Sequence, residues 1–77
     1  MKTLDEFVVL FAEQLDDTDP STITAQTKFR DLDEWSSLLA LTLISMVDEE
    51  FGIALKGDDV KNSETVEDVY NVIKSKL

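Results

Sequence analysis

Two adjacent serines, Ser36 and Ser37, stand directly before a long, mostly apolar stretch and are the residues best placed for chemistry. Serine is a weak nucleophile unless a neighbouring base takes its proton, and the usual base is histidine. The sequence contains no histidine and no cysteine. A self-contained serine hydrolase is therefore not expected. Disulfides, thiolate chemistry and a Cys/His zinc site are excluded.

Carboxylates offer two further kinds of chemistry, and neither fits. A carboxylate pair could perform acid/base catalysis, but this needs a substrate cleft that 77 residues can hardly enclose. Asp17, Asp19 and Ser21 have the alternating spacing with which a calcium loop begins. The sixth position is Thr22 where glycine is required, and the twelfth is Lys28 where glutamate is required. We therefore expect a solvated turn here, no metal site and no intrinsic enzyme activity.

Length and charge restrict the class of protein. Seventy-seven residues make one domain, 1–77, near the lower size limit for a fold without disulfides or metal. Seventeen acidic residues oppose seven basic ones, giving a net charge of −10. Such a surface repels nucleic acid and suits basic partners. The 43% of apolar residues indicates a folded chain.

The start of the sequence and the length of its apolar runs indicate where in the cell the protein is expected. We see no basic-then-apolar signal segment at the start and no run long enough to cross a bilayer. We therefore expect a soluble, cytoplasmic protein without membrane insertion. The high net charge favours a monomer.

The elements that must position the serines are helices. Residues 4–15 carry apolar side chains at helical spacing, capped by Thr3, and the pattern stops at the turn-forming residues 16–21. A long connection over 20–36 follows. Residues 38–51 form the next helix, which Gly52 ends. A short helix is expected around 58–61 and a last helix over 65–76, where Thr65 and Asp68 resemble a capping box.

The helical spacing also predicts which side chains are buried. We expect the main core contacts to be made by Phe7, Phe11, Phe29, Val47, Tyr70 and Ile73. The helix 38–51 has more apolar residues than one buried face requires. Leu39 and Met46 lie seven positions apart and are expected to share an outer stripe.

The segment 34–38 (EWSSL), followed by an apolar helix that ends in 48–52 (DEEFG), resembles the modification-site helix of acyl carrier proteins. The resemblance extends over nearly the whole chain, including its length, its acidity and its order of helices. Counting back from Phe51 without a gap places the family's modified serine on Ser37 and the family's aspartate on Ser36. Because the two serines are adjacent, Ser36 is the rival site.

This resemblance implies both a fold and a function. The fold is an all-α four-helix bundle of the acyl carrier type, with three longer helices and one short one. A separate phosphopantetheinyl transferase would attach a 4'-phosphopantetheine arm, taken from coenzyme A, to Ser37. The arm's thiol would then carry acyl groups as thioesters, in fatty acid or lipid biosynthesis. A serine at a helix N-terminus suits this attachment, because the free N–H groups and the helix dipole stabilise a phosphodiester.

The sequence also differs from typical members of this family at positions that affect partner binding. In typical fatty-acid carriers the positions of Leu39 and Thr42 are acidic, whereas here acids remain only at the end of the helix. We therefore predict that partner enzymes with basic or apolar docking surfaces bind a patch that combines apolar residues with these acids, as in a specialised carrier for a dedicated pathway. The predicted docking residues are Trp35, Leu39, Met46, Asp48 and Glu49. The alternative for the three apolar ones is that the long connection covers them or that they fill the acyl cavity. The alternatives are an aminoacyl or peptidyl carrier, and an unmodified acidic adaptor that binds a basic protein surface.

Overall fold

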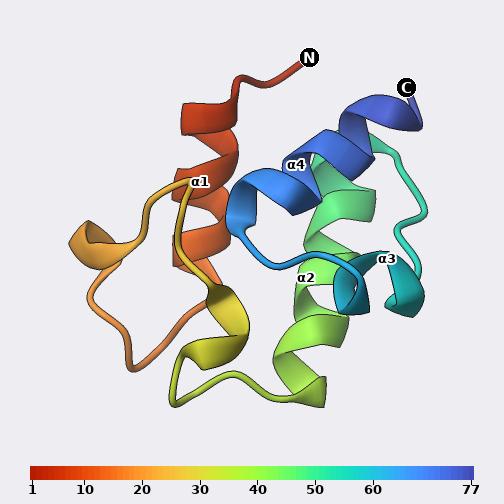
Figure 1. The fold of residues 1–77 in the computed structure, drawn as a ribbon. Helices are drawn as coiled ribbons and strands as arrows, with labels where there is room; N and C mark the ends of the chain where they lie inside the picture. The colour runs from red at the N-terminus through yellow and green to blue at the C-terminus, as the bar shows by residue number, and fades with distance from the viewer.

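The computed structural model describes all 77 residues, Met1–Leu77, and contains only helices and turns. The four α-helices are α1 (Leu4–Glu13), α2 (Ser37–Phe51), α3 (Gly57–Lys61) and α4 (Val66–Ser75). Two 3₁₀ turns, Pro20–Thr22 and Phe29–Asp31, lie in the long connection between α1 and α2. Both chain ends lie at the end of the bundle opposite to the start of α2 (Figure 1). The predicted all-α bundle with three longer helices and one short one is confirmed.

The first and last helices begin with the predicted caps. The Thr3 hydroxyl accepts a hydrogen bond from the backbone N–H of Glu6 at 3.2 Å, and the Glu6 carboxylate accepts one from the Thr3 N–H at 2.8 Å. Thr65 and Asp68 repeat this reciprocal pair at 3.2 and 3.0 Å. Each box satisfies two N–H groups that a helix start would otherwise leave without partners. Both capping predictions are confirmed.

The long connection is tied to the start of α4. The backbone N–H groups of Val66 and Glu67 donate to the carbonyls of Thr27 and Ala25 at 3.1 and 2.9 Å. These bonds hold residues 25–27 in place, directly before the 3₁₀ turn Phe29–Asp31. The connection is therefore a fixed part of the fold and can position side chains against α2.

Aromatic rings form the centre of the core. Phe11 contacts Phe7 and Phe29 with ring centroids 6.2 and 5.7 Å apart, and Phe7 also contacts Tyr70. The six residues predicted to make the main core contacts are all buried, namely Phe7, Phe11, Phe29, Val47, Tyr70 and Ile73. The predicted core is confirmed at each of these positions.

The predicted outer stripe of α2 is wrong. Met46 is only 6% exposed and belongs to the core, and Leu39 is half-buried against it. Met46 follows Leu43 by three positions and therefore lies on the same face of the helix as Leu43 and Val47, both of which are buried. The large apolar side chains that α2 does expose are Leu38, at 72%, and Leu41, at 63%.

None of the helices combines the length and the apolar character needed to span a bilayer.

Candidate functional site

Ser36 caps α2. Its backbone is extended, with φ −154° and ψ 172°, and its hydroxyl oxygen accepts a hydrogen bond from the backbone N–H of Leu39 at 3.3 Å. This bond satisfies one of the N–H groups of the first helical turn. The Ser36 hydroxyl therefore already has a structural role.

Ser37 is the first residue of α2, and its side chain is exposed. Its hydroxyl makes no hydrogen bond with the rest of the protein. The backbone N–H groups of Ser37 and Leu38 also donate to no protein acceptor. Such free N–H groups, together with the positive end of the helix dipole, favour an anion next to the Ser37 side chain.

Glu34 fixes the segment that leads into α2. Its carboxylate accepts hydrogen bonds from the backbone N–H groups of Asp16 and Asp17, both at 3.1 Å, and from the Thr18 hydroxyl. The Thr18 hydroxyl, with smaller contributions from the neighbouring N–H groups, lowers the pKa of Glu34 below its ordinary value. Sequence reasoning missed this role, because the partners lie 16 to 18 positions away and no local pattern connects them.

Trp35 anchors the same segment to the core. Its indole stacks on Phe11 with an interplanar angle of 8° and centroids 6.3 Å apart. It also meets Phe29 edge-on at 4.7 Å. Trp35 is half-buried, so part of its side chain remains available to a partner. Together, Glu34 and Trp35 hold the two serines at a defined position.

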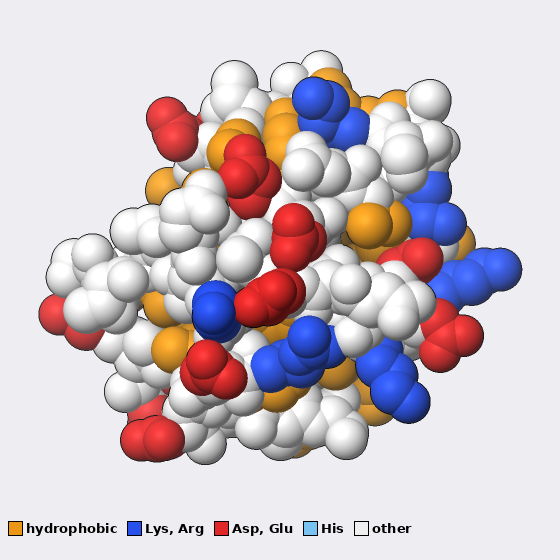
Figure 2. Space-filling view, in the orientation of Figure 1, with side chains coloured by type: hydrophobic (Ala, Val, Ile, Leu, Met, Phe, Trp, Pro, Cys, Tyr) orange, Lys and Arg blue, Asp and Glu red, His pale blue; other side chains and the backbone are white.

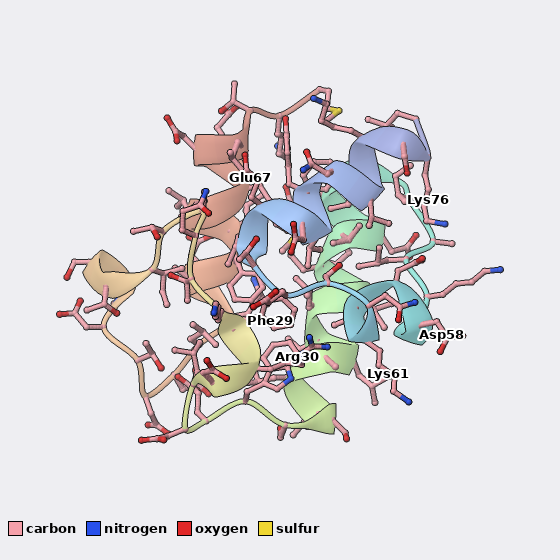
Figure 3. All side chains as sticks on the ribbon, in the orientation of Figure 1. Phe29, Arg30, Asp58, Lys61, Glu67 and Lys76 are labelled. Carbon is pink, nitrogen blue, oxygen red and sulfur yellow. The ribbon has the colours of Figure 1, made fainter.

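A cleft of about 260 Å³ opens beside Ser37. It lies between the 3₁₀ turn Phe29–Asp31, the start of α2 and α3, and no acidic residue lines it. Arg30 and Lys61 lie near the end of the bundle where α2 begins (Figure 3), and the Arg30 guanidinium donates a hydrogen bond to the backbone carbonyl of Lys61. The full lining consists of Arg30, Trp35, Ser36, Ser37, Ala40, Gly57, Val60 and Lys61. The free hydroxyl, the free N–H groups and two cations together fit a phosphate-linked group attached to Ser37.

The outer surface of α2 is apolar at its start and acidic at its end. Leu38 and Leu41 are exposed in the first half, and Asp48 and Glu49 are exposed in the last turns. Neither α1 nor α2 contains a lysine or arginine. The structure thus combines exposed apolar and acidic side chains on one helix, but the exposed apolar residues are Leu38 and Leu41 and not the predicted Leu39 and Met46. Leu38 and Leu41 lie three positions apart and therefore share a helix face that points away from the buried Leu43. This spacing could have identified them from the sequence.

The structure also contains no cluster of three or more side chains that could hold a metal ion.

One comparison with known proteins identifies the family. Residues 5–73 match the family described as "Phosphopantetheine attachment site". Proteins of this family are non-catalytic carriers that hold 4'-phosphopantetheine covalently, and they interact with a phosphopantetheinyl transferase and with partner enzymes. The match covers every element that positions Ser37 and its cleft. The chain therefore belongs to the phosphopantetheine attachment-site family of carrier proteins.

Proposed function

We propose that this protein is an acyl carrier whose 4'-phosphopantetheine arm is attached to the Ser37 oxygen. The observation that carries the proposal is the difference between the two adjacent hydroxyls. Ser36 uses its oxygen to cap α2, whereas the Ser37 hydroxyl is exposed and makes no hydrogen bond with the protein. An enzyme can therefore reach Ser37 without breaking the helix cap.

The attachment step requires a base that this chain does not supply. A bond forms between the Ser37 oxygen and the phosphorus of the pantetheine phosphate in coenzyme A. The bond from that phosphorus to the adenosine bisphosphate portion breaks, and the hydroxyl proton leaves to a base. Because no histidine exists and no carboxylate bonds the Ser37 hydroxyl, the transferase must provide this base. The chain itself acts as substrate and carrier and not as an enzyme.

The absence of cysteine allows a direct test of the carrier role. The unmodified chain contains no thiol, so every thiol found after modification belongs to the arm. We expect incubation with coenzyme A and a broad-specificity transferase to give one titratable thiol per chain. Incubation with acetyl-coenzyme A should give a protein of higher mass whose thiol appears only after mild hydroxylamine cleaves the thioester. An unchanged mass in both incubations would favour the unmodified adaptor.

We further propose that the carrier serves a dedicated pathway and docks through α2. The exposed pair Leu38 and Leu41, here called the leucine patch, lies one turn apart near Ser37. Trp35 and Leu39 border it as half-buried residues, and the acids Asp48 and Glu49 lie further along the helix. Met46 is buried and is not part of this surface. A partner with an apolar depression beside the serine and lysines or arginines further away would fit.

Substitutions on α2 can distinguish binding through the leucine patch from binding through the acidic side chains. Replacing both leucines of the patch by glutamine should weaken binding to the loading enzyme of the dedicated pathway, with little effect on folding, because both side chains are exposed. Val9→Gln is the matched control, since Val9 is 60% exposed but lies on α1. Strong, salt-sensitive binding to a fatty-acid synthase enzyme, lost in Asp48→Asn and Glu49→Gln, would instead indicate a general fatty-acid carrier.

A further inference from the structure

We infer that Arg30 and Lys61 form a cationic clamp for the phosphodiester of the arm. The inference rests on the proposed attachment at Ser37 and names residues that would bind the phosphate after attachment. Both residues line the cleft that also contains Ser37, and they come from two different elements, the 3₁₀ turn Phe29–Asp31 and α3.

The Arg30 guanidinium is held in place before any ligand arrives. One of its N–H groups donates to the backbone carbonyl of Lys61, and its central carbon lies 5.8 Å from the centroid of the Phe29 ring. A guanidinium has five N–H donors, so this bond leaves donors for an anion. Planar, fixed donors suit a phosphate, which an arginine can bind through two parallel hydrogen bonds.

Neither cation of the clamp is held in an ion pair, a property that Lys56 and Lys74 share. Lys2, Lys28 and Lys76 form ion pairs with carboxylates at 3.3 to 3.5 Å. Arg30 and Lys61 form none, although acidic residues outnumber basic ones by 17 to 7. The cleft therefore contains two cations without an ion pair in a molecule whose net charge is −10.

Two cations beside Ser37 can stabilise the negative charge that the attachment adds. A phosphodiester adds a negative charge to a molecule that already repels anions. The free N–H groups of the first turn of α2 stabilise that charge from one side of the site. Arg30 and Lys61 are placed to stabilise it from the cleft side. The clamp is open to solvent, so its effect should weaken as salt screens the charges.

Phosphorus NMR of the modified protein tests the clamp without any enzyme assay. The ³¹P signal of the intact protein should differ from that of a proteolytic fragment that carries the arm, and added potassium chloride should move it toward the fragment value. The double variant Arg30→Gln/Lys61→Gln should shift the signal toward the fragment value at low salt and should make it less sensitive to added salt than in the wild type. Lys74→Gln is the matched control, because Lys74 is a cation outside the cleft without an ion pair.

The outcomes separate this inference from the proposed attachment. A signal that is the same in the wild type, the double variant and the fragment would contradict the clamp and leave the attachment intact. A wild-type chain that gains no arm would contradict the attachment itself. If the double variant does not fold, the salt titration of the wild type decides, and a salt-insensitive signal contradicts the clamp.

Discussion

At the scale of single residues, the serine pair divides two tasks between neighbouring hydroxyls. Ser36 holds the backbone of α2 through the N–H of Leu39, and Ser37 presents its oxygen to solvent. In the alignment expected from the sequence, Ser36 replaces an aspartate of the family, and aspartate and serine are both strong N-cap residues. The departure at this position therefore preserves the cap.

Ser36→Ala should lower the free energy of unfolding by about 0.5–2 kcal/mol, since it removes the N-cap of the longest helix. Ser36→Asp should restore that stability or exceed it, because a carboxylate also interacts favourably with the helix dipole. Urea denaturation of the three proteins provides the comparison. Equal stability of Ser36→Ala and the wild type would show that the cap contributes nothing.

Glu34 should make stability depend on pH. Its pKa is lowered in the folded protein, chiefly by the Thr18 hydroxyl. The unfolded chain therefore takes up a proton at higher pH than the folded chain. The contribution of Glu34 to the free energy of unfolding is fully present above the ordinary glutamate pKa of about 4.3. It is lost as the pH falls through the lowered pKa of the folded protein.

Glu34→Gln should remove this part of the pH dependence, because glutamine does not titrate. The measurement is the free energy of unfolding of both proteins between neutral and acidic pH. The difference between them should be largest at neutral pH and should shrink on acidification. A difference that stays constant down to the lowest pH would contradict the assigned hydrogen bonds.

At the scale of elements, local patterns predicted the helices because their signals are local. The capping boxes at Thr3 and Thr65 depend on residues three positions away, and both are present. The face of α2 was less predictable. Its sequence is apolar on nearly every side, so periodicity alone does not tell which stripe the other elements cover. Packing buried Met46 and left Leu38 exposed.

The candidate site was predictable only in part, for a similar reason. The position of Ser37 at a helix start follows from local sequence. The bonds of Glu34 to residues 16–18 and of Arg30 to Lys61 join positions far apart in the chain. Such contacts depend on how the connection between α1 and α2 folds back, which no spacing in the sequence reveals.

The end of α2 gives a further prediction at this scale. Gly52 has φ +67°, in the left-handed region, and its N–H donates to the Asp48 carbonyl at 2.9 Å. A Cβ there would meet no atom within 4 Å, so the cost of Gly52→Ala is backbone strain alone, about 1 kcal/mol. Gly57→Ala is the control, since Gly57 has no such φ and also has open space. Equal effects of the two substitutions on urea denaturation would contradict this account.

At the scale of the whole molecule, charge is distributed unevenly. α1 and α2 carry acids without any lysine or arginine. In Figure 2, lysine and arginine side chains lie among acidic ones on the side of the molecule that carries α3, and others lie at the top and near the centre of the view. Because the net charge is −10, the acidic side chains repel one another in the folded state and lower its stability.

Added salt should therefore stabilise the protein at neutral pH. Raising the ionic strength to about 0.15 M shortens the Debye length to about 8 Å and screens the repulsion between acids. The melting temperature should rise, and it should rise less in Glu49→Gln, because one exposed acid is removed. A melting temperature that falls with potassium chloride would contradict a dominant role for repulsion.

The proposed attachment to Ser37 connects all three scales, and mapping the modified residue tests it most directly. The chain is incubated with coenzyme A and a phosphopantetheinyl transferase, digested, and sequenced by mass spectrometry. The arm should be found on Ser37 in the wild type and in Ser36→Ala, and Ser37→Ala should gain no mass. An arm on Ser36 in the wild type, or an arm retained in Ser37→Ala, would contradict the proposed site.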